Sequence, residues 1–508
     1  MRVLFVSAEM FPLAKTGGLG DVAAALPEAL VGLGLDMRVL IPGYRQALAL
    51  AKGARAIADL SRLLGVGPAR LLEWRAEAHG ATVWLLDCPS LFDRDGGLYQ
   101  DRAGRDWPDN ARRFGLLSKA AALVALGDAG LSWQPDLVHA NDWHAGLVPL
   151  YLKIADRPAP ASLFAIHNLA YQGGYDFAEL AGLGLPERLY NPGGIEFYGR
   201  ASLLKAGVVF ADRLVTVSPS YAREILTPEF GFGFDGLLRA RADRLCGILN
   251  GVDGGVWDPA GDPLLPRLYG ANDLAGKAAC KALVQHELGL KKEPDRPLIG
   301  FVSRLAHQKM ADVMAGALSR LVAAGAQIVV HGQGEREYEH GLLQAAASLA
   351  GKAAVCVGYD EGLAHRVIAG ADLVLVPARY EPCGLVQLYG LRYGSLPIVR
   401  RTGGLADTVV DADHRALIAD RATGFVFEHA EADAMVAAAG RALALYREPV
   451  TWRRLQRRAM AQDFGWRRSA RAYGGLYDQM APAARPLALA AFEDRTIPAQ
   501  RDQSRASA

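Results

Sequence analysis

The chain has 508 residues, which is enough for two or three domains of ordinary size. Its 56 Lys and Arg residues nearly balance 54 Asp and Glu residues, so the formal net charge is +2, and 51% of the residues are hydrophobic. This balance is typical of a globular protein and excludes a general nucleic-acid or membrane-surface binder, because such binding needs a marked basic excess. Glycine is unusually frequent, with 56 copies or about 11%, against an ordinary usage of about 7%.

Targeting and disulfide signals are weak. The apolar run at 3–7 is too short for a signal peptide, and no segment approaches the length of about 20 apolar residues that a membrane span needs. The cysteines are odd in number, far apart and without a CxxC pair, which indicates reduced thiols rather than a disulfide framework or a zinc site. We therefore expect a cytoplasmic protein that binds neither membranes nor nucleic acid.

Short apolar runs alternate with longer amphipathic segments, which predicts parallel sheets with helical crossovers. In the first half we expect strands at 3–7, 37–41, 82–86, 137–139, 163–166, 214–217 and 247–249. In the second half we expect them at 298–302, 327–331, 354–357, 373–376 and 397–399. The fold class is thus α/β with two doubly wound units, and a ligand site should lie between the carboxyl ends of their strands.

The segment 253–268 is rich in Gly, Pro and Asp, which predicts an exposed connection between the two units. We place one domain at 1–248 and the other at 249–460. Beyond residue 481 the amphipathic periodicity is lost and Pro, Ala, Ser, Gln and Arg accumulate, so a mobile tail is expected over 481–508.

A glycine-rich segment, KTGGLGD at 15–21, lies between the first predicted strand and a helical pattern. Glycines let the backbone approach a ligand, helix N-terminal amides attract anions, and Lys15 adds a charge, so a phosphate or pyrophosphate is the expected guest. Residues 18–23 also fit the dinucleotide fingerprint, but about ten residues separate them from the strand, which disfavours a nicotinamide site. A purely structural turn is the other alternative, and it leaves Lys15 unexplained.

Three polar clusters follow predicted strands of the first half: HANDWH at 139–144, HNLAYQGG at 167–174 and NGVD at 250–253. Their Asp, His, Asn and Gln side chains could converge on a polyhydroxylated ligand. A metal site is disfavoured because the histidines of the first cluster are not at the helical i, i+4 spacing of metal ligands. For any single histidine here, a capping or core role competes equally with catalysis.

The second half carries its charged residues at strand ends. Arg304 and Lys309 follow a predicted strand and suit a diphosphate, Arg through its planar fork and Lys as a compact charge. Glu381 lies between another strand end and a helix start framed by Pro and Gly, and RRTGGLAD at 400–407 forms a second glycine turn. Together they predict a nucleoside-diphosphate site at one rim of the second domain.

Eight segments resemble, in order, the motifs of the ADP-glucose-dependent bacterial glycogen synthases and plant starch synthases, glycosyltransferase family 5. The resemblance covers residues 1 to about 480 and is carried by KTGGLGDV (15–22), HANDWH (139–144), IHNLAYQG (166–173), VSPSYAREI (217–225), ILNGVD (248–253), VSRLAHQK (302–309), YEPCGLVQLYGLRYG (380–394) and RRTGGLADTV (400–409). It implies a GT-B fold, in which two Rossmann-like domains face each other across a deep cleft and a helix at 461–480 returns to the first domain. The implied activity is retaining transfer of glucose from ADP-glucose to the non-reducing end of an α-1,4-glucan, which elongates glycogen without a cofactor.

The resemblance also implies roles for matching residues. Glu381 is the expected catalytic carboxylate near the glucose hydroxyls, and Arg304 and Lys309 hold the diphosphate and stabilise its charge as it leaves. His167 is expected beside the glucose 6-hydroxyl, and Asp142 on the first-domain side of the cleft. The expected substrate-binding residues are Lys15, Gly18, Asp21, Asn250, Tyr359 as a stacking partner for adenine, Cys383, Gly384 and Leu385.

The chain departs from the family pattern near the nucleotide side. Met310 follows Lys309 where the family usually has glycine, and a methionine would be strained if that position requires a positive φ. The family's Leu-Gly-x-Gly turn appears as HGQG at 331–334. Tyr389 stands where many related retaining enzymes have a second glutamate, which agrees with the glycogen synthase branch.

Other functions remain as alternatives. A protein that keeps the fold but binds glucan or nucleotide sugar with impaired catalysis is suggested by Met310 alone, and the nicotinamide oxidoreductase and a pyridoxal-phosphate phosphorylase are weaker still. The D-x-D matches at 93–95 and 411–413 could suggest a metal-bound diphosphate. We interpret both as solvated surface acids and expect no metal requirement.

Overall fold

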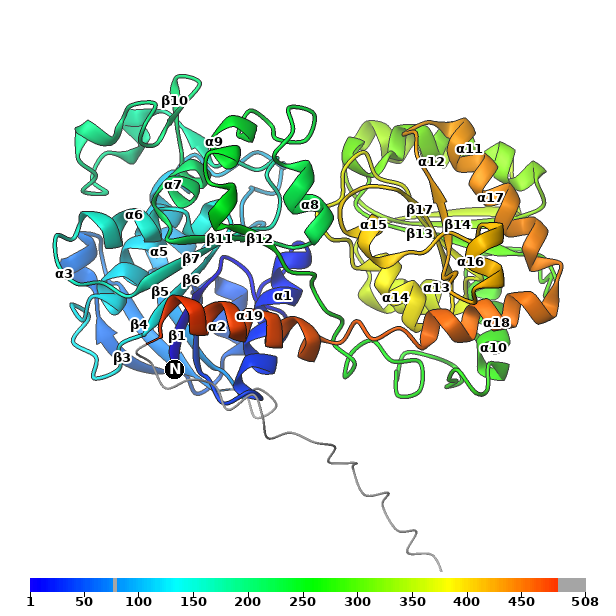
Figure 1. Cartoon of the computed structure of the whole chain (residues 1–508), viewed down its shortest axis with the longest axis horizontal. Coiled ribbons are helices and arrows are strands. Elements are labelled where there is room, and N and C mark those ends of the chain that lie inside the picture. The colour runs from blue at the N-terminus through cyan, green and yellow to red at the C-terminus, as the bar shows by residue number, and fades with distance from the viewer. Residues whose placement is uncertain (76–79, 483–508) are drawn as a thin grey trace, which may run out of the picture.

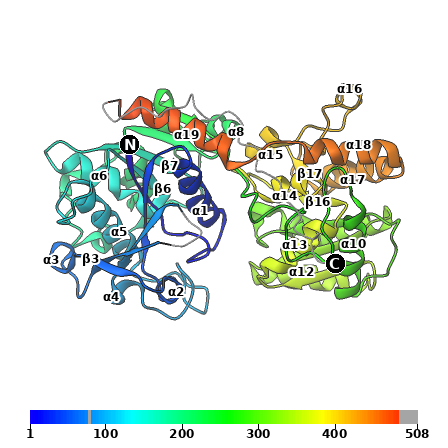
Figure 2. The same cartoon turned by 90° about the horizontal axis from the view of Figure 1, so that it is seen from below.

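The computed structural model describes residues 1–75 and 80–482, and from residue 483 onward the expected tail lies outside the described residues (Figure 1). The chain forms two α/β domains side by side, and the long helix near the C-terminus lies against the first of them (Figure 1). The same arrangement, seen from below, places helices on both sides of each sheet (Figure 2).

The first sheet has nine strands in the order β12-β11-β7-β6-β1-β2-β5-β4-β3. From β12 to β5 the strands are parallel: β1 (Arg2–Val6), β2 (Asp36–Pro42), β5 (Thr82–Asp87), β6 (Leu137–Asn141), β7 (Ala161–Ile166), β11 (Arg213–Thr216) and β12 (Leu245–Gly247). At one edge β4 (Arg70–Trp74) and β3 (Arg55–Asp59) are antiparallel and were not predicted, because they lack the continuous apolar runs of buried parallel strands. The strand expected at 247–249 lies two residues earlier, as β12.

The second sheet is parallel and runs in the order β15-β14-β13-β16-β17-β18. Its strands are β13 (Leu298–Val302), β14 (Gln327–Gly332), β15 (Ala353–Val357), β16 (Leu373–Val376), β17 (Leu396–Arg400) and β18 (Phe425–Phe427). The strand order reverses between β13 and β16, and in the first sheet it reverses at β1. Ligands of doubly wound sheets bind beyond the carboxyl ends of strands at such switch points. The loops after β1, β13 and β16 are therefore the places to look for a site.

The helices of the first domain are α1 (Gly18–Val31), α2 (Arg45–Leu50), α3 (Ser61–Leu64), α4 (Pro89–Phe92), α5 (Asn110–Ala125), α6 (Leu147–Ile154), α7 (Leu203–Phe210), α8 (Pro219–Glu224) and α9 (Asp235–Arg239). Those that follow are α10 (Ala275–Glu287), α11 (Ala311–Ala323), α12 (Arg336–Ala347), α13 (Glu361–Gly370), α14 (Val386–Arg392), α15 (Gly403–Thr408), α16 (His414–Ile418), α17 (Ala432–Tyr446), α18 (Pro449–Met460) and α19 (Trp466–Met480). None of the helices in the described part of the chain is long and apolar enough to cross a bilayer. A small antiparallel sheet joins β8 (Gly174–Tyr175), β10 (Arg200–Ser202) and β9 (Glu196–Phe197).

The two largest hydrophobic cores of the described residues divide the chain. The first contains buried residues from Val3 to Leu238 together with Trp466, Ala470, Tyr473 and Tyr477 of α19, and the second begins at Val252 and ends at Met460. Tyr477 places its hydroxyl 2.7 Å from Nδ1 of His139 in the middle of β6. Helix α19 thus completes the core of the first domain after the chain has built the second.

The expected exposed connection at 253–268 is wrong in part. Trp257 is buried and stacks on His365 with ring centroids 3.6 Å apart. Asp262 accepts a hydrogen bond of 2.7 Å from the Tyr393 hydroxyl, and its carboxylate lies 2.7 Å from Nδ1 of the same histidine. The Gly, Pro and Asp content indicated turns correctly. Composition could not show that Trp257 and Asp262, which lie among these turns, point into the second domain.

Candidate active site

The glycine segment after β1 is held by a buried carboxylate. Glu9 accepts hydrogen bonds from the Thr16 amide at 2.7 Å, from the Thr16 hydroxyl at 2.6 Å and from the Gly17 amide at 3.2 Å. The hydroxyl of Tyr99 donates a fourth, at 2.6 Å. Four donors stabilise the buried charge and fix the loop that leads into α1. Sequence reasoning missed Glu9, whose one signal is an acidic residue close behind a strand.

Lys15 joins the two domains at this loop. Its Nζ lies 2.8 Å from Oδ1 of Asp21 and 3.3 Å from Oε1 of Glu361, the first residue of α13 in the second domain. Burial raises the pKa of Asp21 to about 6, although Lys15 opposes the shift. Tyr359 donates its hydroxyl to Glu361 and keeps a ring that is 65% exposed. The structure thus brings three predicted site residues together through Glu361, which was not predicted.

A second group lies at the carboxyl ends of β6 and β7. His167 Nε2 is 3.0 Å from Oδ1 of Asn141, whose Nδ2 donates to the carbonyl of Val6. Burial lowers the pKa of His167 to about 4, so the ring is neutral at pH 7. Because its Nε2 donates to Asn141, its Nδ1 is left to accept a hydrogen bond from a hydroxyl. Asp142 has a φ of 58° and accepts from the Trp143 amide, and burial raises its pKa to about 7.

The two histidines of the predicted polar cluster at 139–144 have structural roles. His139 is fully buried against α19, and His144 is buried and stacks on Trp143 with ring centroids 3.8 Å apart. The core alternative therefore holds for these two, whereas His167 keeps partial exposure at the strand end.

Lys309 and Glu381 form an ion pair at the switch point of the second sheet. Lys309 ends the short 3₁₀ helix His307–Lys309 after β13, and Glu381 follows β16 with a side chain that is almost fully buried. Gly404 donates its amide to the Glu381 carbonyl at 3.1 Å, and a Cβ at Gly403 would overlap that same carbonyl oxygen. The RRTGGLAD turn therefore needs glycine because it packs directly on the backbone of Glu381.

Around this pair lie the remaining predicted residues of the second domain. Gly384 has a φ of 74°, which favours glycine, and Leu385 would lie 3.5 Å from a Cβ built on Gly18 of the first domain. Burial raises the pKa of the Cys383 thiol to about 12, and its sulfur accepts from the backbone of Asn250. The loop that carries these residues thus touches both the glycine segment and the chain crossing between the domains.

Arg304 extends the charged rim toward the first domain. Its guanidinium lies over the ring of Tyr171 at 5.6 Å from the centroid, and its Nη2 lies 3.4 Å from Oε1 of Gln308. Gln308 in turn donates to the carbonyl of Tyr380 at 3.1 Å, one residue before Glu381. A hollow of about 30 Å³ beside Lys309 and Glu381 has room for a water-sized group.

Helix α8, within the segment VSPSYAREI, lies beside α15 of the second domain (Figure 2). It bonds to the loop of Glu381 and to the RRTGGLAD turn. The Ser218 hydroxyl donates to the Pro382 carbonyl, and the Ser220 amide and hydroxyl both donate to Asp407 at 2.7 Å. Glu224 accepts from the Gly403 amide at 2.7 Å. Sequence reasoning gave this segment no role beyond its resemblance, and the structure shows that it links the domains beside Glu381.

Met310 adopts the left-handed conformation that the family's glycine would adopt freely. Its φ is 55° and its ψ is 34°, and its side chain is fully buried. The positive φ confirms that this position is strained for methionine, at a cost of about 1–2 kcal/mol. Burial of a large apolar side chain contributes about 2–5 kcal/mol in the opposite direction, so the methionine is tolerated.

We expect Met310→Gly to lower the free energy of unfolding by about 1–3 kcal/mol, because lost burial exceeds relieved strain. Met310→Ala should be less stable than Met310→Gly by about 1 kcal/mol, since alanine loses the same burial and keeps the strain. Urea unfolding of the three proteins measures the difference. An alanine variant more stable than the glycine variant would show that the backbone here is unstrained.

The glycines of the HGQG turn and the acids of the D-x-D matches have structural roles. A Cβ at Gly332 would overlap the carbonyl oxygen of Ser303, and one at Gly334 that of Leu305, so the HGQG turn keeps the glycines that the close approach of the two loops requires. The four acids of the D-x-D matches each have a structural partner within the described chain: Arg45 for Asp93, Arg102 for Asp95, Arg441 for Asp411 and the amide of Ala416 for Asp413.

Comparisons with known proteins identify the family of the chain. The family model of the starch synthase catalytic domain matches residues 2–240, and that of glycosyl transferases group 1 matches residues 287–458. The glycogen synthase of Burkholderia thailandensis is 51% identical over 485 residues, which cover 95% of this chain and 91% of that protein. The chain belongs to the glycogen synthase family. The glycogen synthase of Paramagnetospirillum magneticum is 48% identical, with coverage of 94% of this chain and 98% of that protein.

Solved structures give the same result for the fold. The catalytic domain of starch synthase IV from Arabidopsis thaliana, bound to ADP and acarbose, matches with a TM-score of 0.84 and 31% identity over 95% of this chain and 99% of that chain. Sucrose-phosphate synthase from Thermosynechococcus elongatus matches at a TM-score of 0.58 and 20% identity, which shows the fold alone. The GT-B fold is confirmed, and the chain is a glucosyltransferase that elongates a glucan. The nicotinamide interpretation of residues 18–23 is therefore wrong.

Proposed function

We propose that the donor is ADP-glucose, that the acceptor is the non-reducing end of an α-1,4-glucan of glycogen, and that the anomeric configuration is retained. The observation that carries this proposal is the buried Lys309–Glu381 pair with Arg304 on the same rim, opposite the loop of Lys15. A diphosphate needs fixed cations, and a sugar beside it needs a carboxylate for its hydroxyls. The likeness to a starch synthase bound to ADP and acarbose supports the choice of donor and acceptor.

Each residue has a role in the proposed site. Arg304 and Lys309 bind the diphosphate and stabilise the negative charge that grows on it as the glucosyl bond breaks. Glu381 orients Lys309 and accepts hydrogen bonds from the glucose hydroxyls, while the Gly384 and Leu385 amides face the sugar or phosphate. Neutral His167 hydrogen-bonds the glucose 6-hydroxyl. Asp142 lies, like His167, on the first-domain side of the site.

The nucleotide is proposed to lie between Lys15 and the exposed ring of Tyr359. Lys15 supplies a cation at the domain boundary, Gly18 and Asp21 shape its loop, and the Tyr359 ring offers a face for adenine. Asn250 and Cys383 lie where the chain crosses to the second domain and support the loop of Glu381.

The deciding experiment compares ADP-glucose with UDP-glucose as donors on a glycogen primer. We expect kcat/KM to be at least about tenfold higher for ADP-glucose, because the site must discriminate bases that differ in size and hydrogen-bonding edge. Nuclear magnetic resonance of the product should show an α-anomeric proton at each new linkage. Equal rates with both donors, or a β linkage, would contradict the proposal.

We also propose that the reaction needs no metal or cofactor. Among residues 1–75 and 80–482, no group of three His, Cys, Asp or Glu side chains is arranged to hold a metal ion, and the D-x-D acids are occupied by protein partners. Fixed cations from Arg304 and Lys309 supply the charge that a metal would otherwise supply. EDTA should therefore leave turnover unchanged. Loss of activity in EDTA with recovery on adding magnesium would overturn this proposal.

A cytoplasmic location is proposed as well. All five cysteines are free thiols, and three of them, Cys88, Cys280 and Cys383, are buried. Unpaired thiols suit a reducing compartment.

A further inference from the structure

Four aromatic side chains form a path from the candidate active site to the outer surface. They are Tyr380, Phe232, Tyr171 and Tyr198, which we call the aromatic ridge. Tyr380 immediately precedes Glu381, and its ring centroid lies 5.0 Å from that of Phe232 in an edge-to-face arrangement across the domain boundary. The ridge therefore begins beside the catalytic carboxylate and includes both domains.

Tyr171 and Tyr198 are the exposed members of the ridge. Tyr171 is 45% exposed and lies beneath the guanidinium of Arg304. Tyr198 contacts Gly233, the residue after Phe232: a Cβ built there would lie 3.0 Å from its ring. From Glu381 the path therefore runs through Tyr380, Phe232 and the adjoining Gly233 to Tyr198. Tyr171 lies at its side: the next residue, Gln172, donates to the Phe232 carbonyl at 3.0 Å.

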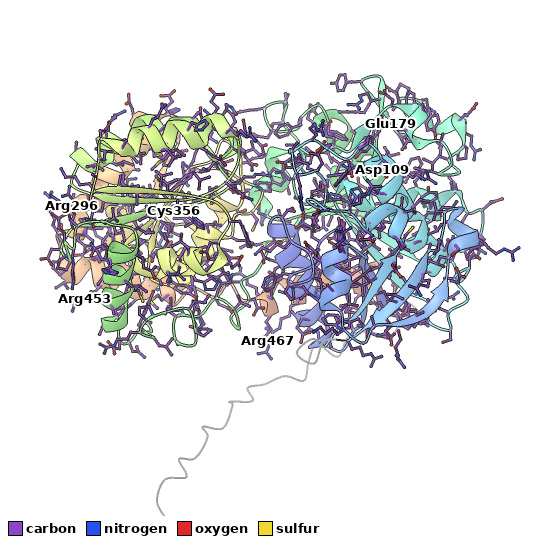
Figure 3. The ribbon with its side chains drawn as sticks, turned by 180° about the vertical axis from the view of Figure 1, so that it is seen from behind. Asp109, Glu179, Arg296, Cys356, Arg453 and Arg467 are labelled. Carbon is purple, nitrogen blue, oxygen red and sulfur yellow. The ribbon has the colours of Figure 1, made fainter. Side chains whose placement is uncertain are left out.

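Tyr198 lies at the tip of the hairpin between β9 and β10, which Figure 1 shows at the top of the first domain. Glu179, in the preceding segment between β8 and β9, is labelled at the top of the first domain in the view from behind (Figure 3). The side chain of Tyr198 is 80% exposed, and its φ is 50°, in the left-handed region that disfavours non-glycine residues. Its neighbour Phe197 packs on Phe234 and anchors the hairpin.

The fold gains little from Tyr198. A ring that is mostly in water contributes little burial, and a positive φ is unfavourable for tyrosine. A non-glycine residue with positive φ and an exposed aromatic ring, connected by contacts to a reactive centre, indicates ligand binding.

We propose that the aromatic ridge binds the glucan acceptor beyond its reacting end, with Tyr198 as the outermost platform. The proposal rests on the proposed function, since it takes the acceptor to be an α-1,4-glucan. Pyranose rings present apolar C–H faces that pack on aromatic rings, and their hydroxyls hydrogen-bond at the edges. A neutral polymer such as a glucan also fits the net charge of +2, because so small a charge does not attract a charged polymer strongly.

The test measures transfer from ADP-glucose to maltose and to glycogen with Tyr198→Asn and Tyr198→Phe. Asparagine tolerates the left-handed backbone and removes the ring, whereas phenylalanine keeps the ring. We expect Tyr198→Asn to raise the KM for glycogen about tenfold, the loss of one stacking platform, with kcat and the KM for maltose unchanged. Tyr198→Phe should behave like the wild type, as should Val450→Ala, which changes an exposed residue at the start of α18.

An unchanged KM for glycogen in Tyr198→Asn would overturn the proposal, and so would an equal loss on maltose and glycogen, which would indicate general damage. Retardation of the protein in native gels that contain glycogen supplies a second readout that needs no turnover. A wild-type protein that transfers glucose to neither acceptor would count against the proposed function, and the gel would still decide the ridge: retardation lost in Tyr198→Asn supports it, and equal retardation overturns it.

Discussion

Replacing Glu381 with glutamine is expected to lower kcat by at least about 100-fold, the usual effect of losing one preorganised electrostatic group. Glutamine keeps the shape of the side chain but removes the charge that pairs with Lys309 in a nearly sealed environment. A buried interaction of this kind acts in a low dielectric, where its loss is not compensated by water. Initial rates of glucose incorporation into glycogen at saturating ADP-glucose measure the effect.

The matched control for this substitution is Glu428→Gln. Glu428 is on the same domain and pairs with Arg401, but its side chain is 59% exposed, so the pair contributes little. We expect its kcat to equal that of the wild type. Wild-type turnover in purified, folded Glu381→Gln would remove Glu381 from the catalytic residues.

Lys309→Ala is expected to reduce kcat by about 100-fold or more and to raise the KM for the donor as well. The lysine has two proposed partners, the diphosphate and Glu381, so its removal takes a cation from the leaving group and leaves a buried carboxylate without its counter-charge. Steady-state kinetics with varied ADP-glucose separate the two effects.

Two further variants serve as controls for Lys309→Ala. Lys292→Ala, on an exposed loop of the same domain, should leave both constants unchanged. Lys309→Arg should recover only part of the rate, because the guanidinium is planar and larger and cannot occupy the position of a compact ammonium. If Lys309→Ala turned over as fast as the wild type, charge stabilisation at this position would have no part in the reaction.

Much of the fold could be predicted because its strands are buried on both faces. The expected strands of both sheets read as continuous apolar runs, and most were found within one or two residues. Strands β3 and β4 could not be found this way, since they form an antiparallel edge whose apolar runs are broken by charged residues such as the exposed Arg55 and its partner Glu73. The burial of Trp257 was equally invisible, because it depends on His365 more than 100 residues later.

The candidate site was predictable where a charged side chain comes soon after the end of a predicted strand. Lys309 and Glu381 each stand a few residues beyond the end of a strand, so position and charge together indicated them. Glu9 and Glu361 were missed because they act through other side chains: Glu9 on the Thr16 loop and Glu361 on Lys15. Asn141 was predicted only as a member of the polar cluster at 139–144, and its contact with His167 was not predicted. Such pairings depend on how strands and domains meet, which local sequence does not encode.

The hydrogen bonds between α8 and the second domain bear on the position of Glu381. Ser218, Ser220 and Glu224 hold Pro382, Asp407 and Gly403, which surround Glu381 on either side of its loop. The loop of Glu381 is therefore held in part by a helix of the opposite domain, so any separation of the two domains would break these hydrogen bonds and release the loop. The position of Glu381 is thus a property of the contact between the two domains, and neither domain fixes it alone.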